Sequence, residues 1–128
     1  MIFKETKSIY LQIADRIMDE ILQGNYPEED RIPSVRVYAS LVEVNANTVV
    51  RTYEYLQNQE IIYNKRGIGY FVKEGARKSI RKLRKELFIN EVLPDVFQEM
   101  NLLNFTPEDV LKRYNKFLEE HAKDGNGS

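Results

Sequence analysis

Two short helical segments separated by a two-residue turn place the strongest constraint on the fold of this chain. Pro33-Ser34 is a helix start with Ser34 as the expected N-cap, and the apolar spacing predicts a helix over about 35–42. Asn45 then caps a second helix, which runs to about residue 58. Helices joined by a turn as short as Glu43-Val44 must cross at a steep angle. The sequence therefore predicts a helix-turn-helix.

The segments on either side of this pair extend the prediction to a whole domain. Before the pair, apolar residues recur at helical spacing between Ser8, an expected N-cap, and Gly24, an expected C-terminal glycine. After the pair, two β-rich runs at 61–63 and 70–72 flank a glycine-containing turn at 64–69. Three helices followed by a two-stranded hairpin form a winged helix. The predicted fold is mainly α with a small β-hairpin.

The C-terminal part of the chain has a different composition. Apolar residues recur at helical spacing within a basic run at 77–85, which predicts an amphipathic helix. Pro94 must kink or restart this helix, because an interior proline removes a backbone donor. Thr106-Pro107 starts a further helix, since a hydroxyl cap precedes a proline at the first helical position. The basic run either faces solvent on a dimer helix or adds positive charge near a DNA backbone.

The helices of the C-terminal part are too few to bury their apolar faces against each other. We therefore expect this part to complete its core in a second subunit, as a homodimer. The expected boundaries are a winged helix over 1–75, a helical dimerisation segment over 76–123 and a flexible tail over 124–128. The residues expected to form the dimer contact are Leu83, Leu87, Val110, Leu111, Tyr114, Phe117 and Leu118.

The composition excludes several classes of protein. The chain has no cysteine and one histidine, His121, so disulfides, thiol catalysis and a His-based metal cluster within one chain are excluded. No stretch approaches the roughly 18–20 apolar residues that span a bilayer, and the N-terminus lacks a signal-peptide layout, which favours the cytoplasm. The chain has neither a nucleophile elbow nor a phosphate-binding glycine loop. We expect no enzyme activity, no cofactor and no metal.

The charge distribution is more informative than the net charge of -1. Residues 1–75 hold 9 basic and 11 acidic side chains, and residues 76–128 hold 10 basic and 9 acidic ones. Many of the acids lie at 15–30, whereas basic residues lie on the helix-turn-helix and the hairpin. This distribution favours modest non-specific affinity for DNA, with specificity supplied by a few placed residues.

Four segments together resemble the GntR family of transcription regulators. They lie in the family's order across residues 8–73, and the short C-terminal part is similar to that of the YtrA-like subfamily. The segments are Ile9–Ile17, Arg31–Arg36, Val44–Tyr53 and Arg66–Val72. The resemblance implies a DNA-binding regulator, often a repressor of transport-related genes, controlled by an effector of unknown identity. In that subfamily a short helical dimerisation segment replaces the large ligand-binding domain.

Three departures from the family pattern are visible. Glu43 stands where most members carry a glycine in the turn between the two helices. Glu28-Glu29-Asp30 replaces the usual Pro-Gly-Asp. Ala46 and Val50 stand where many members carry basic residues. Base contacts made by those basic residues therefore do not carry over to this chain.

The resemblance and the geometry of major-groove recognition indicate which residues meet DNA. The helix over 45–58 is expected in the major groove, where Asn pairs with adenine and Arg with guanine. Arg36 is expected on a phosphate, and the hairpin tip at 64–69 on the minor groove. Each has a plainer interpretation as a helix cap, a surface arginine or an ordinary turn. The expected DNA-binding residues are Ser34, Arg36, Asn45, Asn47, Thr48, Arg51, Lys65, Arg66, Gly67 and Gly69.

The sequence therefore predicts a homodimeric, sequence-specific transcription regulator, most simply a repressor, bound to an inverted-repeat operator of double-stranded DNA. One alternative is a winged-helix protein-interaction module without specific DNA binding, which Ala46, Val50 and the acidic pI of about 5.9 favour. Another is a small-molecule sensor that uses the C-terminal helices. Positive charge gathered on the face formed by the helix over 45–58 and the hairpin would favour the DNA-binding interpretation.

Overall fold

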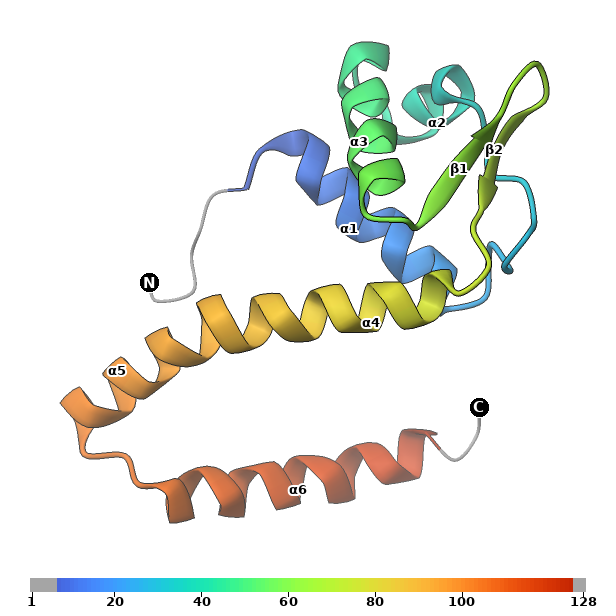
Figure 1. Cartoon of the computed structure of the whole chain (residues 1–128). Coiled ribbons are helices and arrows are strands. Elements are labelled where there is room, and N and C mark those ends of the chain that lie inside the picture. The colour runs from blue at the N-terminus through green and yellow to red at the C-terminus, as the bar shows by residue number, and fades with distance from the viewer. Residues whose placement is uncertain (1–6, 126–128) are drawn as a thin grey trace. The chain divides into compact units, whose positions relative to one another are not determined.

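The computed structural model describes residues 7–125, which fall into two compact units, residues 7–87 and 88–125 (Figure 1). The first unit comprises α1 (Ile9–Leu22), α2 (Val35–Val42), α3 (Ala46–Asn58), β1 (Ile62–Lys65), β2 (Gly69–Val72) and α4 (Ala76–Leu87). The second comprises a π-helical turn, η1 (Phe88–Val92), followed by α5 (Leu93–Leu103) and α6 (Pro107–Gly125). This order confirms the predicted fold class, a mainly helical chain with a winged helix and a helical C-terminal part.

The core of the first unit is apolar and lies where α1, α2 and α3 meet. The predicted stripe of α1 faces it, with Ile17 and Ile21 almost completely buried. Tyr53 and Leu56 of α3 and Tyr38 of α2 pack into the same cluster. Full burial of one such side chain contributes roughly 1.5–3 kcal/mol. The shared core therefore fixes how α2 and α3 cross.

Two tyrosine hydroxyls inside this unit have hydrogen-bond partners. Tyr53 donates to the carbonyl oxygen of Pro33 at 2.7 Å, and Tyr38 donates to the Glu20 carboxylate at 3.0 Å. Burial raises the pKa of both tyrosines well above the ordinary value, so both hydroxyls stay protonated and keep donating. The bond to Pro33 fixes the entry to α2.

Helix caps at the starts of α2 and α3 are as predicted. The Ser34 hydroxyl accepts from the Val37 amide at 3.2 Å, and the Asn45 side chain accepts from the Asn47 amide at 2.8 Å. Ser8 occupies the N-cap position of α1 as predicted, but its side chain makes no capping hydrogen bond. The backbone carbonyl of Ser8 accepts the first hydrogen bonds of the helix instead.

Two glutamates adopt left-handed backbone angles where the family pattern has glycine. Glu43 ends α2 with φ 54°, and Glu29, in the loop before Arg31, has φ 75°. Left-handed backbone costs a residue other than glycine roughly 1–2 kcal/mol. The two turns therefore hold left-handed backbone at some cost in stability.

The hairpin that forms the wing is closed at its base by the segment before α2. Its strands are antiparallel, with Ile62 opposite Val72. Arg31 forms an isolated antiparallel bridge with Phe71. Gly69 is required beside it, since a Cβ there would lie 2.8 Å from Nε of Arg31 and the backbone φ is 146°.

α4 packs within the first unit. Ala76 and Ile80 are completely buried, and Arg77 and Arg84 donate to backbone carbonyls of α1. Leu83, predicted as a dimerisation residue, packs against the core of its own unit. The compact unit therefore runs to residue 87 and includes α4.

The N-terminus of α4 is capped by a carboxylate from a loop that is distant in the sequence. Glu28 accepts hydrogen bonds from the backbone amides of Gly75, at 2.8 Å, and Arg77, at 3.1 Å. These two bonds hold the pKa of Glu28 below its ordinary value. Glu28 thus accepts hydrogen bonds from amides that have no partner within the helix, because they lie at its start.

In the second unit, the expected disturbance at Pro94 takes the form of a π-helical turn that leads directly into α5. Pro94 lies in the first turn of α5, where a missing amide proton costs nothing, and the π-helical η1 precedes it. α6 begins with a reciprocal cap in which Thr106 and Asp109 exchange hydrogen bonds of 3.0 and 3.1 Å. α6 reaches Gly125, so the predicted tail starts inside the helix, and its residues 126–128 lie outside the described part.

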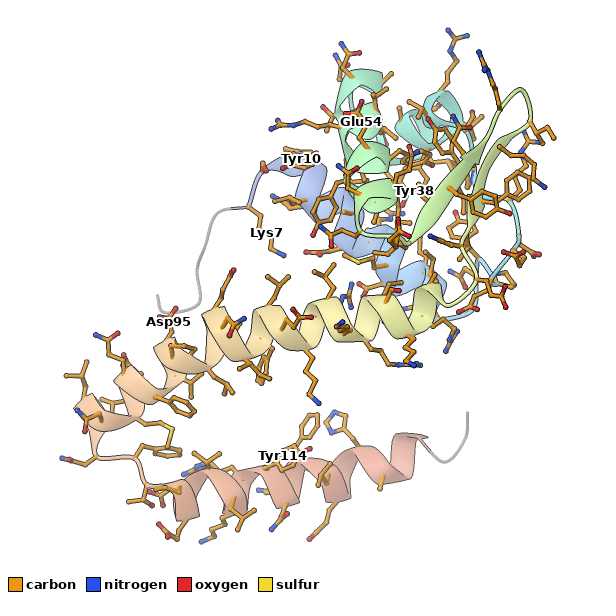
Figure 2. All side chains as sticks on the ribbon, in the orientation of Figure 1. Lys7, Tyr10, Tyr38, Glu54, Asp95 and Tyr114 are labelled. Atoms are coloured by element: carbon orange, nitrogen blue, oxygen red, sulfur yellow. The ribbon has the colours of Figure 1, made fainter. Side chains whose placement is uncertain are left out.

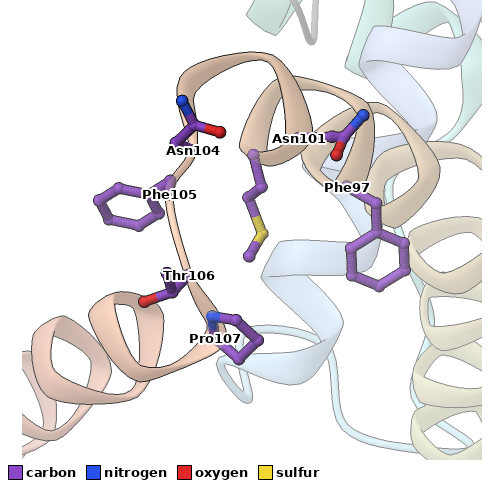
Figure 3. Close-up of a pocket in the computed structure, with 7 residues that line it drawn as sticks. Phe97, Asn101, Asn104, Phe105, Thr106 and Pro107 are labelled. Carbon is purple, nitrogen blue, oxygen red and sulfur yellow. The ribbon is translucent and has the colours of Figure 1, made fainter.

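Much of the apolar surface of the second unit is exposed. On α6 the exposed large side chains are Val110, Leu111, Tyr114, Phe117 and Leu118. A shallow hollow of about 380 Å³ lies where α5 gives way to α6 (Figure 3). It is lined by Phe97, Met100, Asn101, Asn104, Phe105, Thr106 and Pro107. Across residues 7–125, the helices fall short of the length and apolar character that crossing a membrane requires.

Candidate nucleic-acid interface

The outward face of α3 presents the residues predicted to contact bases. Val49 and Tyr53 on the opposite side are buried, so the core holds the helix firmly. Asn47 and Arg51 are exposed, and Thr48 between them is half-buried. Asn47 and Arg51 share one side of the helix because they are four residues apart. The structure therefore brings three predicted site residues together at the N-terminal half of α3.

Arg51 stacks on the first turn of α1. Its Cζ atom lies 4.1 Å from the centroid of the Tyr10 ring, and that ring packs edge-on against Tyr55. The Thr52 hydroxyl donates to the carbonyl oxygen of Tyr10 at 2.7 Å, which joins the two helices. Figure 2 shows Tyr10 at the start of α1, beside α3. Tyr10, which was not among the predicted site residues, thus helps to orient Arg51.

A hollow of about 290 Å³ lies between the start of α1 and α3. It gathers an amide, hydroxyls and a guanidinium, which are groups that bind base edges or phosphate oxygens. The lining residues are Ser8, Ile9, Tyr10, Asn47, Thr48 and Arg51. The first turn of α1 therefore belongs to the candidate interface, together with α3.

The two capping residues keep donors for a partner. Asn45 uses its side-chain oxygen to cap α3, which leaves the amide nitrogen of that side chain as a donor. Ser34 likewise caps α2 through its oxygen. Arg36, two residues after Ser34 and in the first turn of α2, is exposed. The capping and DNA-contacting interpretations of Asn45 are therefore compatible.

The wing presents cations on a narrow hairpin. Lys65 and Arg66 are exposed, and Lys65 Nζ lies 4.8 Å from the centroid of the Phe71 ring. Phe71 in turn stacks on Tyr63 at 5.7 Å. Gly67 has φ 79°, a left-handed conformation that suits glycine in a tight turn. Packing thus supports the stem of the wing and leaves its basic tip exposed.

Arg31 joins the cations of the wing, although the prediction omitted it. Its side chain lies against Gly69, and its backbone pairs with Phe71. No local sequence signal indicates this position, because the bridge joins residues that are far apart in the chain. Arg31 is exposed and adds a positive charge near Lys65 and Arg66.

Positive charge gathers on the segment that forms the interface. Residues 31–72 hold five basic and three acidic side chains, whereas residues 7–30 hold two basic and six acidic ones. Asp19 among these acids pairs with Arg84 at 2.7 Å, and Glu28 caps α4. In Figure 1, α1 lies between α3 and α4. Asp19 and Glu28 therefore have their partners on α4 or at its start.

His121 lies on α6, outside this interface. Its Nδ1 atom is 3.0 Å from the carbonyl oxygen of Phe117, and its ring stacks on Phe117 with centroids 4.0 Å apart. Among residues 7–125, the His, Asp and Glu side chains form no group of three or more that could hold a metal ion.

Residues 9–72 span α1 to β2 and match the family described as bacterial regulatory proteins, gntR family. The chain belongs to the GntR family. This GntR-family chain is 36% identical over 117 residues to the HTH-type transcriptional regulator YhcF of Bacillus subtilis, covering 91% of this chain and 95% of YhcF. It is 32% identical over 77 residues to the transcriptional repressor YtrA of the same organism, covering 60% of this chain and 59% of YtrA.

A solved structure extends the likeness beyond the winged helix. The crystal structure of a GntR-family transcriptional regulator from Bacteroides thetaiotaomicron superposes with a TM-score of 0.79 and 54% sequence identity. The match covers 89% of this chain and 99% of that one. This GntR-family protein is therefore a DNA-binding transcriptional regulator, and its relatives are regulators and not enzymes. The family resemblance stated from the sequence is confirmed.

Proposed function

We propose that this GntR-family protein is a repressor that binds an inverted-repeat DNA operator as a homodimer. Each copy inserts α3 into the major groove of one half-site and places the wing, residues 64–69, at the adjacent minor groove. One observation carries the proposal: Asn47 and Arg51 are exposed on the same side of a helix whose opposite face is buried. A helix held in this way can present side chains to base edges with little loss of conformational freedom.

Cations around α3 supply the contacts to phosphates. Arg36 lies at the start of α2, and Arg31, Lys65 and Arg66 lie on or beside the wing. Contacts to phosphate position a protein on DNA and carry no sequence information, whereas contacts to base edges specify the site. We therefore assign affinity mainly to these cations, and specificity mainly to α3.

The homodimer is supported by the apolar stripe of α6. Tyr114 is 56% exposed and Phe117 49% exposed, and their rings stack with centroids 6.4 Å apart. Exposing the apolar side of an amphipathic helix to water is unfavourable, and a second copy of the chain would cover this side. Leu87, at the end of α4, is another exposed apolar residue predicted for this contact. A two-fold dimer binds two half-sites of opposite orientation.

The repressor role is supported by the relative YtrA, which is named a transcriptional repressor. The proposal does not require an effector. Action on the chromosome places the protein in the cytoplasm.

Selection of duplexes from a random pool, followed by hydroxyl-radical footprinting, tests the proposal. The expected result is an enriched inverted repeat with two protected patches related by two-fold symmetry, about one helical turn of roughly 10 base pairs or a multiple of it apart. Arg51→Ala should lose the protection, and Lys82→Ala, on the exposed surface of α4, should keep it. Failure to enrich any sequence would contradict the proposal.

A second candidate is a protein-interaction module. It is favoured by Val37 and Leu41 of α2, which are 52% and 63% exposed. A protein of this kind would enrich no sequence from the random pool. The same selection therefore separates the two candidates.

A further inference from the structure

Two apolar residues of α3, Ala46 and Val50, lie next to the polar residues Asn47 and Arg51 on its exposed face. Ala46 and Val50 are one helical turn apart, so their side chains are only about 40° apart around the axis. Both are exposed, and Val50 retains 40% of its accessible surface. Asn47 and Arg51 follow them directly on the same outward face. The surface that α3 offers to a partner thus combines hydrogen-bonding groups with methyl groups.

Val50 lies outside the hydrophobic core cluster of the first unit. Its neighbour Val49 is completely buried and supplies the core contact of this turn. Valine is also a weaker helix former than alanine, by a few tenths of a kcal/mol. The exposed part of this branched apolar side chain is therefore available for a contact outside the chain.

The surroundings of Val50 indicate which partner makes that contact. Arg51 lies next to it, Arg36 lies at the start of α2, and the wing contributes Lys65 and Arg66. An apolar protein surface would have to desolvate these cations, whereas DNA pairs them with phosphates. Within the major groove, the apolar group on a base edge is the C5-methyl of thymine. Alanine and other methyl-bearing side chains contact that group.

We infer that Ala46 and Val50 contact the C5-methyl groups of thymines, so that α3 recognises A·T base pairs in each half-site. The inference rests on the proposed function and assigns its base preference. Asn47 lies beside these two residues and suits the adenine N6 and N7 atoms of such pairs. Thymine methyl and adenine edge belong to the same base pair, so adjacent side chains on one helix can contact both. The apolar positions are therefore part of the specificity and not a loss of it.

Single replacement of each half-site thymine by deoxyuridine tests the inference, because only the methyl group is removed. The duplex is the one selected as above. Wild-type protein should lose about fourfold in affinity at one or two positions per half-site, the value expected for one buried methyl. Val50→Ala should bind the unmodified duplex correspondingly more weakly and should no longer respond to deoxyuridine at one of those positions. Val37→Ala, which trims an exposed valine on α2, should respond as the wild type does.

Two results would overturn the inference and leave the proposed function intact. In one, the selected duplex binds specifically but no deoxyuridine lowers affinity. In the other, Val50→Ala and Ala46→Gly both keep the full response to deoxyuridine. If selection enriches no sequence, the proposed function fails, and the inference fails with it. A normal thermal unfolding curve for Val50→Ala confirms that any change in binding arises at the surface.

Discussion

The guanidinium of Arg51 lies over the ring of Tyr10, with Cζ 4.1 Å from the ring centroid. The contact joins a residue of the recognition helix to the first turn of α1, and the Thr52 hydroxyl bonds the same turn through the Tyr10 carbonyl. A long side chain held in this way has fewer rotamers to lose when it meets a base. In the proposed complex with DNA, α1 would therefore support recognition through Arg51, in addition to its role in the core.

Removal of the Tyr10 ring should weaken operator binding. An exposed cation–π contact is worth roughly 0.5–1 kcal/mol, so Tyr10→Leu should raise the Kd by about two- to fivefold. Tyr10→Phe keeps the ring and should bind as the wild type does. In the background of Arg51→Ala, Tyr10→Leu should have almost no further effect on the Kd. An equal loss in both backgrounds would show that Tyr10 acts independently of Arg51.

Arg36 and Arg51 should differ in the kind of loss they cause. Arg36→Ala should weaken binding to operator and random DNA alike, and should reduce the slope of log K against log salt by about 1, because a phosphate contact is lost. Arg51→Ala should cost roughly 1–3 kcal/mol on the operator and much less on random DNA. Titrations of both duplexes at several salt concentrations measure this. A sequence-selective loss for Arg36→Ala would contradict its assignment to phosphate.

Glu43→Gly should stabilise the winged helix. Glu43 has φ 54°, which glycine adopts without strain, so the free energy of unfolding should rise by about 1 kcal/mol. The matched control is Glu54→Gly, which places glycine inside α3 and should lower the free energy of unfolding by a similar amount. Urea denaturation of the three proteins measures both changes. If the Glu43→Gly variant is less stable than the wild type, the left-handed backbone at Glu43 is not strained as proposed.

The bonds from Glu28 to the start of α4 should make stability depend on acid pH. The pKa of Glu28 is lower in the folded protein than its ordinary value of 4.5, because the amides of Gly75 and Arg77 donate to its carboxylate. The stabilisation is therefore present above about pH 4.5 and is lost as the pH falls through the lowered pKa. Glu28→Gln should have a lower Tm than the wild type at pH 7, and the gap should narrow in acid. A gap that stays constant would contradict the contribution of the carboxylate charge.

A charge placed in the apolar stripe of α6 should disrupt the proposed dimer. Leu111→Asp should shift the protein toward a monomer in sedimentation velocity at micromolar concentration, because the interface would bury an unpaired carboxylate. Lys116→Gln makes the same change in net charge on the polar side of α6 and should leave the assembly unchanged. An unaltered dimer in Leu111→Asp would place the interface elsewhere.

Local signals predicted much of this fold. Ser34 and Asn45 cap the helices that their positions suggested, and the stripe of α1 is buried as its spacing required. What could not be predicted are contacts between residues far apart in the chain. The bond from Glu28 to Arg77, the placement of Arg84 on α1 and the stacking of Arg51 on Tyr10 depend on tertiary packing. None of them follows from a periodic pattern.

The candidate site shows the same division. Asn47 and Arg51 were predicted from the family resemblance and from the geometry of major-groove recognition, which uses the N-terminal residues of the helix. Arg31 was missed, since only its bridge to Phe71 brings it to the wing. Leu83 was assigned to a dimer contact from its spacing alone, but it packs against the core of its own unit. Spacing identifies an apolar face but does not identify what covers that face.

The ratio of affinities for the selected operator and for random DNA tests the central claim most directly. Both duplexes are titrated with the same protein at about 150 mM and about 300 mM salt. We predict that the operator binds at least about 10³-fold more tightly than random DNA, and that both affinities fall steeply with salt. Equal affinity for the two duplexes would contradict the claim that this protein recognises a DNA sequence.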